Sequence, residues 1–282
     1  MVIADSGSTK TTWALIDSQN NIITKKESIG LNPFFVDVCF IKKTSSKIIE
    51  TADKKKISAV YFYGAGCAND EKCNLVKKGL TATLPNTKIF IYSDLLAAAR
   101  ALFQKQKGWV CILGTGSNAA YYNGRILIKH TPSLGYILGD EGSGTYLGKL
   151  LLQHILYHKL DKTLTNAFHK KYNLDLQNIL LHTYSKPNPN KYLASFTHFL
   201  KEYENHSSIQ QLIYNGFSDF IKNHIQPYMK NDIETIGFIG SVAFSFKEIL
   251  IQACLDHNLT VLDIQKSPMD GLIKYHIQNN RK

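Results

Sequence analysis

The stretch Met1-Val2-Ile3-Ala4-Asp5-Ser6-Gly7-Ser8-Thr9-Lys10 is an apolar run typical of a buried strand, followed at once by a glycine turn rich in hydroxyls. A glycine lets the backbone turn tightly and come close to a ligand, and free N–H groups beside Ser and Thr hydroxyls form a concave anion site. Asp5 adds a carboxylate where a magnesium ion carrying phosphates needs an oxygen ligand or a water-bridged one. The stretch therefore predicts a strand that ends in a phosphate-binding loop.

Two later turns repeat this pattern. Gly114-Thr115-Gly116-Ser117-Asn118 follows the apolar run 109–113, and Gly240-Ser241-Val242-Ala243 follows the run 233–239. A single turn of this kind is weak evidence, because most Gly/Ser turns after strands are only turns. Three of them in order predict a nucleotide held between two lobes.

The composition is that of a globular protein with an anionic ligand. The chain has 282 residues, 44% of them apolar and 20% charged, and this length favours two lobes. The net charge of +11 comes from lysines spread over many segments, with no helix-turn-helix, zinc-finger or aromatic-basic RNA pattern beside them. We therefore expect no nucleic-acid partner, although positive potential favours substrates such as ATP.

The cysteines and the apolar runs indicate in which cellular compartment we expect the protein. The five cysteines form no C-x-x-C pair, which suggests reduced thiols in a cytoplasmic protein. No apolar run approaches the ~20 residues that cross a bilayer, so we expect neither a membrane span nor export. The ten histidines show no metal-binding spacing, and we propose no structural metal.

Hydrophobic periodicity predicts alternating strands and helices. The first half reads as strands at 2–5, 11–17 and 22–28, a helix at 36–52, a strand at 56–63, a helix at 70–83, a strand at 88–92 and a helix at 95–106. The second half reads as strands at 109–113, 119–122 and 125–129, helices over 143–160 and most of 161–230, a strand at 233–239, a helix at 243–257, a strand at 260–264 and a helix at 268–278. The two strand-loop-strand openings suggest an internal duplication. Trp13 and Trp109, both in strand runs, are expected in the core.

Further motifs resemble a known family over nearly the whole length. They are Gly30-Leu31-Asn32-Pro33, Ser93-Asp94, Ile112 to Asn118, Gly237 to Ala243 and, most specifically, Leu134-Gly135-Tyr136-Ile137-Leu138-Gly139-Asp140-Glu141-Gly142-Ser143-Gly144. With Asp5 to Lys10, they resemble sugar kinases of the actin-like ATPase superfamily, in particular the N-acetylglucosamine kinases grouped with the BadF/BadG/BcrA/BcrD ATPases. The chain departs from many relatives at Ser6 and Ser8, where they have glycines.

The resemblance implies an α/β fold. It is the two-lobed actin-like ATPase (ribonuclease H-like) fold, with duplicated mixed β-sheet domains and a cleft between them. The implied N-terminal lobe is 1–107 plus 265–282, and the implied C-terminal lobe is 108–264. The implied cofactors are ATP and Mg²⁺, with Asp5 serving the metal through water.

Asp94 is the catalytic candidate, since phosphoryl transfer to an alcohol needs a base. From residue types alone, Ser93 or Asp94 reads first as the N-cap of the following helix, and the resemblance reverses that preference in favour of a base. For the consecutive carboxylates Asp140 and Glu141, capping is again the first reading. The resemblance implies instead that they accept hydrogen bonds from sugar hydroxyls.

The resemblance implies two sets of ligand contacts. The substrate-binding candidates are Asn32, Asp94, Ser117, Asn118, Gly135, Asp140 and Glu141. The cofactor-binding candidates are Asp5, Gly7, Ser8, Thr9, Lys10, Gly114, Thr115, Gly116, Gly240 and Ser241. Lys10 stays open, because an outward lysine on a strand is as good a reading as a phosphate ligand.

The sequence thus predicts an ATP-dependent kinase of a small amino sugar, with N-acetylglucosamine phosphorylated at its 6-hydroxyl as the first candidate. Two alternatives stay open. One is an amino-sugar or muropeptide-fragment sensor without turnover, and the other is an activator ATPase of an acyl-CoA dehydratase-type partner. The activator branch carries an iron–sulfur cluster whose cysteine spacing Cys67 and Cys73 lack. A homodimer is compatible with the sequence.

Overall fold

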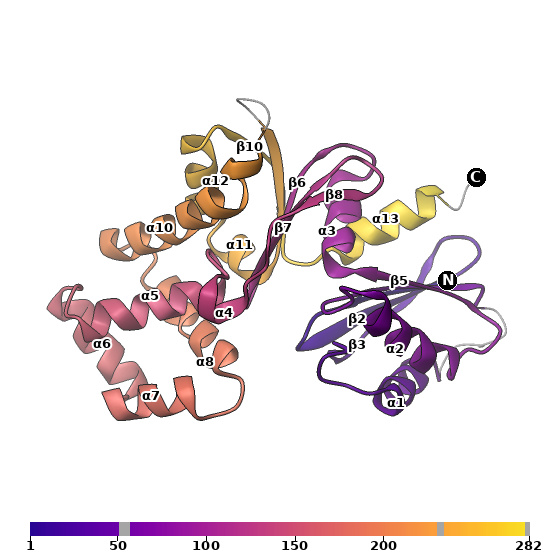
Figure 1. The fold of residues 1–282 in the computed structure, drawn as a ribbon, viewed down its shortest axis with the longest axis horizontal. Coiled ribbons are helices and arrows are strands. Elements are labelled where there is room, and N and C mark those ends of the chain that lie inside the picture. Colours follow the sequence, from indigo (N-terminus) through magenta and orange to yellow (C-terminus); the bar gives the residue numbers. More distant parts are fainter. Residues whose placement is uncertain (51–56, 230–233, 280–282) are drawn as a thin grey trace. The chain divides into compact units, whose positions relative to one another are not determined.

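The computed structural model describes residues 1–50, 57–229 and 234–279, and the chain divides into two compact units (Figure 1). Unit 1 is Met1–Gln106, Gly124–Ile126 and Pro268–Lys282, and unit 2 is Lys107–Asn123 and Leu127–Ser267. The assignment of the two expected lobes, 1–107 plus 265–282 and 108–264, stays a prediction. Each unit contains one five-stranded sheet.

The sheet of unit 1 has the order β3-β2-β1-β4-β5. Its strands are β1 (Val2–Ser6), β2 (Lys10–Ile16), β3 (Ile22–Ile29), β4 (Ala59–Gly64) and β5 (Lys88–Ser93). β1, β2 and β3 form an antiparallel meander, whereas β1, β4 and β5 run parallel. Ser6, Gly64 and Ser93 lie in register, so the three parallel strands end at the same edge.

Helices cover both faces of this sheet (Figure 1). On one face, α1 (Val38–Ile49) and α2 (Asp70–Thr81) bury Ile41, Ile49 and Leu80 together with strand residues such as Trp13. On the other face, α3 (Asp94–Phe103) and α13 (Met269–Asn279) bury small and branched side chains against Ile3 and Ala14. The expected core position of Trp13 is thus observed.

The sheet of unit 2 repeats this topology in the order β10-β9-β6-β7-β8. Its strands are β6 (Gly108–Leu113), β7 (Ser117–Tyr122), β8 (Leu127–His130), β9 (Glu234–Ile239) and β10 (Leu259–Gln265). β6, β7 and β8 are antiparallel neighbours, and β6, β9 and β10 run parallel. The α/β class and the duplicated mixed sheets predicted from the sequence are confirmed.

The helices of unit 2 form the larger core, into which Trp109 is fully buried. They are α4 (Gly135–Leu138), α5 (Gly144–Leu156), α6 (Lys162–Tyr172), α7 (Leu176–Tyr184), α8 (Pro189–Ser195), α9 (Thr197–Glu202), α10 (Ser207–His224), the 3₁₀ turn η2 (Gln226–Tyr228), α11 (Ser241–Ser245) and α12 (Lys247–Asp256). Within the described ranges, none of the helices is both long and apolar enough for a membrane span.

The expected elements differ most clearly from the structure in three places. The single helix expected at 243–257 is interrupted at Phe246, which separates α11 from α12. The strand expected from Arg125 begins at Leu127, and the short helix α4 was not expected. Parts of the elements expected at 36–52, 56–63, 161–230 and 233–239 reach residues outside the described ranges.

Candidate functional site

In unit 1, the first glycine turn joins β1 to β2, and hydrogen bonds of Ser6, the last residue of β1, support it. The backbone N–H of Gly7 donates to the carbonyl of Lys10 (2.9 Å), which closes the turn. The buried Ser6 hydroxyl lies 2.8 Å from Thr11 Oγ1 and accepts from the backbone N–H of Leu31 (2.9 Å). Ser6 therefore supports the loop.

The end of β3 packs against the same turn at Gly30. A Cβ atom on Gly30 would lie 2.4 Å from the carbonyl oxygen of Gly7 and 2.7 Å from that of Ser8, so only glycine fits there. Next along the chain, the buried Asn32 donates from Nδ2 to Ser8 Oγ (2.8 Å) and accepts at Oδ1 from the backbone N–H of Phe34 (3.0 Å). The predicted sugar residue Asn32 thus contacts the predicted phosphate residue Ser8.

Lys10 points to the surface of the β2–β3 pair. Its Nζ lies 2.5 Å from Glu27 Oε1, and both side chains are more than half exposed. A surface ion pair of this kind is weak and opens easily. The phosphate role of Lys10 stays a prediction, as does that of Thr9 in the turn beside it.

Asp5 and Asp94 lie at the edge where the parallel strands of unit 1 end. Asp5 is on β1, and Asp94 follows β5 as the first residue of α3. The pKa of Asp5 is raised from 3.8 to about 7, mainly by burial and then by the charge of Asp94, while Lys10 opposes both. Burial also raises the pKa of Asp94, against the hydrogen bond from Leu95 N–H (2.8 Å). The edge therefore holds two coupled carboxyl groups.

The N-cap of α3 is Ser93. Its hydroxyl accepts from the backbone N–H of Leu96 at 3.3 Å. This separates the two readings of Asp94, because the capping hydrogen bond from the third residue of the helix goes to Ser93. The Asp94 carboxylate accepts instead from the backbone N–H of its neighbour Leu95 and interacts with its own backbone N–H.

In unit 2, the second glycine turn is tied to the start of α5. The carbonyl of Gly114 accepts from Gly144 N–H (2.8 Å), and that of Thr115 accepts from the backbone N–H (3.1 Å) and hydroxyl (2.6 Å) of Thr145. Within the turn, Gly114 N–H donates to Gly116 O at 3.0 Å. The turn and the segment before α5 therefore form one hydrogen-bonded assembly. Sequence reasoning missed Thr145, whose position inside a helix resembles that of any core threonine.

Asp140 and Ser117 meet inside this assembly. Asp140 Oδ1 accepts from the backbone N–H of Ser117 at 3.2 Å. Burial raises the pKa of Asp140. The hydrogen bond from Ser117 lowers this pKa, and the negative charge of Glu141 raises it. The Ser117 hydroxyl is buried and has no hydrogen-bond partner among the described residues. A buried polar atom without a partner is costly, and a ligand or a water molecule that binds it would remove that cost.

The remaining candidates of unit 2 lie on β7, at the start of α4 and at the start of α11. Asn118 accepts at Oδ1 from Ala119 N–H (2.9 Å). Gly135 has a φ of 71° at the start of α4, in front of the exposed side chains of Ile137 and Leu138. Gly240 has a φ of 134°, and its N–H donates to Gln265 O (2.9 Å). The exposed Ser241 is the first residue of α11.

Glu141 is bound from α10, a contact that the sequence did not indicate. His224 Nε2 lies 3.0 Å from Glu141 Oε2, and Asn223 Nδ2 donates to Oε1 at 3.1 Å. Burial alone would raise the pKa of Glu141, but the hydrogen bond from His224 and further contacts lower it overall. Glu141 is therefore held as a carboxylate.

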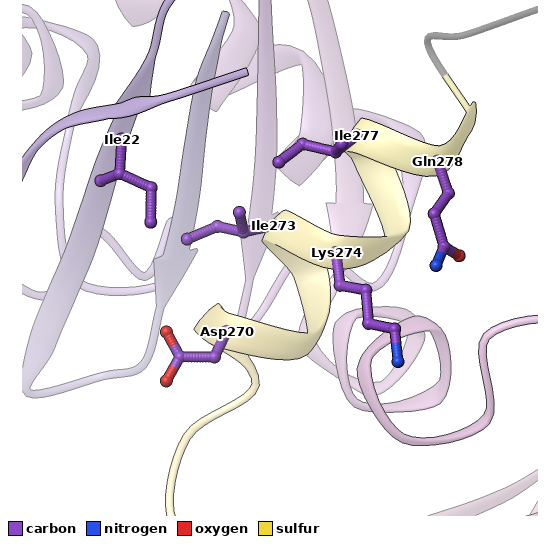
Figure 2. A pocket seen from close by; sticks show the side chains of 6 residues that line it. All are labelled: Ile22, Asp270, Ile273, Lys274, Ile277 and Gln278. Carbon is purple, nitrogen blue, oxygen red and sulfur yellow. The ribbon is translucent and has the colours of Figure 1, made fainter.

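The hollow drawn in Figure 2 lies elsewhere in unit 1 and contains none of the predicted site residues. It has a volume of about 490 Å³ and is lined by Ile22 of β3 and by Asp270, Ile273, Lys274, Ile277 and Gln278 of α13. Ile273 and Ile277 point toward Ile22, so its wall is mainly apolar. Another hollow, of about 610 Å³, is lined by Ser8, Gly30 and the exposed Phe35.

The comparisons with solved structures fit these features. A proposed N-acetylglucosamine kinase from Porphyromonas gingivalis is 37% identical to this chain, with a TM-score of 0.93 and 99% of both chains covered. A proposed N-acetylglucosamine kinase from Chromobacterium violaceum shares the fold at 17% identity and a TM-score of 0.74, covering 97% of this chain and 98% of its own. A ROK family glucokinase from Streptomyces griseus, solved with glucose and AMPPNP, shares it at 13% identity and a TM-score of 0.61, covering 100% and 99%.

The fold and these sites define a member of the actin-like ATPase superfamily of sugar kinases. Within it, the chain belongs to the family of N-acetylglucosamine kinase-like proteins. Neither the profiles of known protein families nor the curated protein sequences match the chain.

Proposed function

We propose that this protein is an ATP-dependent kinase that phosphorylates an amino sugar, N-acetylglucosamine at its 6-hydroxyl. The observation that carries the proposal is the pair Asp5 and Asp94 at one edge of the unit 1 sheet, in a chain 37% identical to a proposed N-acetylglucosamine kinase. Phosphoryl transfer to an alcohol needs a base and a neutralised phosphate, and two carboxyl groups can divide these roles.

Asp94 is the base in this proposal. It accepts the proton of the sugar hydroxyl as that oxygen attacks the γ-phosphorus of ATP, and the bond from this phosphorus to the bridging oxygen breaks, so that ADP leaves. Burial raises the pKa of Asp94, so the ionised carboxylate binds a proton more strongly than an exposed aspartate would. Because Ser93 caps α3, Asp94 can exchange a proton without loosening the helix start.

Asp5 would hold magnesium, through water, beside the first glycine turn. Magnesium prefers carboxylate and water oxygens, which matches this donor. The pKa of about 7 indicates that the buried carboxyl carries its charge at a cost, and a nearby cation would remove that cost. When bound, the metal would neutralise phosphate charge, while Gly7, Ser8 and Thr9 cradle the phosphates.

Some residues of the second turn and of the segment before α5 would bind ATP, and the others would bind the sugar. We assign Gly114, Thr115, Gly116, Gly240 and Ser241 to the nucleotide. The unpartnered hydroxyl of Ser117 and the carboxylate of Asp140 would bind sugar hydroxyls, with Asn32, Asn118 and Gly135 as further contacts. Holding the acceptor hydroxyl in line is itself a large part of the rate enhancement.

The test is ADP release coupled to ATP turnover across a panel of amino sugars, with and without magnesium. We expect magnesium-dependent turnover that rises sharply with N-acetylated hexosamines. N-Acetylmuramic acid, glucosamine and glucose serve as comparison acceptors. If ATP binds but no sugar stimulates ADP release, the kinase proposal fails and a sugar sensor becomes the better description.

A further inference from the structure

Both oxygens of the Glu141 carboxylate are held by consecutive residues at the end of α10. His224 Nε2 and Asn223 Nδ2 lie 3.0 and 3.1 Å from Oε2 and Oε1. The His224 side chain is 7% exposed and that of Glu141 15%, so water competes little for this contact. Shielded hydrogen bonds to a charged group are stronger than those on the surface.

The His224 ring is fixed on its other side as well. Nδ1 lies 3.1 Å from Thr131 Oγ1, and the ring stacks on Phe220 with centroids 5.0 Å apart. A carboxylate only accepts hydrogen bonds, so Nε2 carries the proton that faces Glu141. Nδ1 can then form a hydrogen bond with the Thr131 hydroxyl in either protonation state of the ring: it accepts when the ring is neutral and donates when the ring is charged.

The turn around Glu141 needs such support. Asp140 has a φ of 59° and Gly142 a φ of 70°, so left-handed residues flank Glu141 on both sides. A non-glycine residue in this region costs of order 1 kcal/mol and persists only when its surroundings hold it. A Cβ on Gly142 would lie 3.0 Å from Phe220 Cβ, which shows how closely α10 packs on the turn.

Asp140 depends on this turn for its direction. Its Oδ1 accepts from Ser117 N–H, and the Ser117 hydroxyl beside it is buried without a partner. If Glu141 were released from α10, the left-handed turn could relax and the Asp140 carboxylate would lose its place beside Ser117. The contact from α10 therefore bears on the sugar site although α10 contributes no predicted sugar ligand.

We propose that His224 is a positioning residue for the sugar site: through Glu141, it holds Asp140 in the left-handed turn beside Ser117. This inference rests on the proposed function, since it takes Asp140 as a sugar ligand. Glu141 then acts mainly as the anchor of the turn. His224 itself does not touch the sugar.

Two variants separate the two nitrogens of His224. His224→Gln keeps a donor near the position of Nε2, and so keeps Glu141 bound. His224→Asn keeps a polar atom near Nδ1 toward Thr131 but cannot reach Glu141. We expect His224→Asn to raise the KM for the amino sugar about 10- to 50-fold, with KM for ATP within about twofold. We expect His224→Gln to stay within about threefold of wild type.

His257→Asn is the matched control. His257 Nε2 lies 2.6 Å from Ser218 Oγ on α10, and Nδ1 lies 3.0 Å from Gln226 Nε2. This variant also removes a hydrogen bond to α10, but one that does not involve Glu141 or its partners. We expect a lower melting temperature with an unchanged sugar KM.

Sugar binding to each variant without ATP, measured by calorimetry, keeps the inference separate from the kinase proposal. If wild type binds the sugar but releases no ADP, the kinase proposal fails, and a selective loss of binding in His224→Asn still supports positioning. Three results would overturn the inference. In the first, His224→Asn binds and uses the sugar like wild type; in the second, both His224 variants lose sugar affinity equally. In the third, wild type binds no amino sugar.

Discussion

The two units share one topology but use its loops differently. In unit 1, the strands β1 and β5 end at carboxyl groups, Asp5 within β1 and Asp94 directly after Ser93. In unit 2, the corresponding strands β6 and β10 end at Leu113 and Gln265. The duplicated backbone thus repeats the sheet topology, while the carboxyl groups at these strand ends differ: burial raises the pKa of Asp5 and Asp94 in unit 1, whereas Asp263 of β10 is exposed.

The connections between the third and fourth strands differ most. In unit 1, one helix, α1, lies in the connection between β3 and β4 among the described residues. In unit 2, α4 to α10 lie between β8 and β9. This longer connection carries both Asp140 and the α10 residues that bind Glu141. A polar constellation specific to unit 2 has therefore been added to a shared sheet.

The largest expected effect comes from Asp94→Asn. The amide keeps the size of the side chain but cannot take a proton at neutral pH, so kcat should fall roughly 10²- to 10⁴-fold. The melting temperature should change little, because Ser93 provides the N-cap. Steady-state kinetics and thermal melting of the same preparation measure both quantities.

Ser93→Ala is the control for this prediction. Loss of an N-cap costs about 1 kcal/mol, so this variant should melt earlier and keep kcat within about threefold. A kcat for Asp94→Asn above about a third of the wild-type value would remove Asp94 from the catalytic role.

Asp5→Asn should trade activity for stability. Its folded pKa of about 7 lies above the ordinary 3.8, so between these values the folded protein binds more protons than the unfolded chain. Stability conferred by this group is therefore present at low pH and falls as pH rises from 3.8 to about 7. Without nucleotide, the asparagine variant should melt at a higher temperature than wild type at pH 7.5.

The same variant should lose roughly 10- to 100-fold in kcat/KM for magnesium-ATP. Thermal melting between pH 4 and 8 should also give a flatter profile than wild type. A lower melting temperature at pH 7.5 would contradict the buried, costly charge that we assign to Asp5.

The smallest expected effects come from one buried serine in each unit. Ser117→Ala removes a hydroxyl without a partner, so stability should be unchanged or slightly higher, while the sugar KM rises about 3- to 20-fold. Ser6→Ala leaves Leu31 N–H without its acceptor and should cost about 1–3 kcal/mol.

Chemical unfolding and sugar titration of both serine variants test this contrast. The ligand role of Ser117 would be lost if Ser117→Ala proved unstable with a normal sugar KM.

Much of the fold could be predicted from local patterns. The runs 2–5 and 109–113 are almost continuously apolar and are followed by glycine turns, and both are central strands. The helix 243–257 was expected as one piece because its apolar spacing continues across Phe246. The turn at Phe246 separates α11 from α12, and no glycine or proline there marks this break in the sequence. α4 is too short for a periodic signal.

The candidate site was predictable only in part. Asp5, Asp94 and Asp140 stand in or beside glycine turns and short motifs, which mark them in the sequence. His224 lies 83 positions from Glu141, inside an amphipathic helix where a histidine has no distinguishing pattern. The unpartnered state of the Ser117 hydroxyl is equally invisible in the sequence, because it depends on atoms from other strands and helices.

By itself, the sequence determined the alternation of strands and helices, the duplicated plan and the three glycine turns, since these follow from hydrophobic period and backbone freedom over a few residues. Only the tertiary structure decided which groups meet. It gave the capping hydrogen bond of α3 to Ser93, placed Asp5 near Asp94, and brought α10 onto the turn of Asp140. These outcomes depend on burial and on contacts between distant segments, which raise a pKa or fix a hydrogen bond only after the chain has packed.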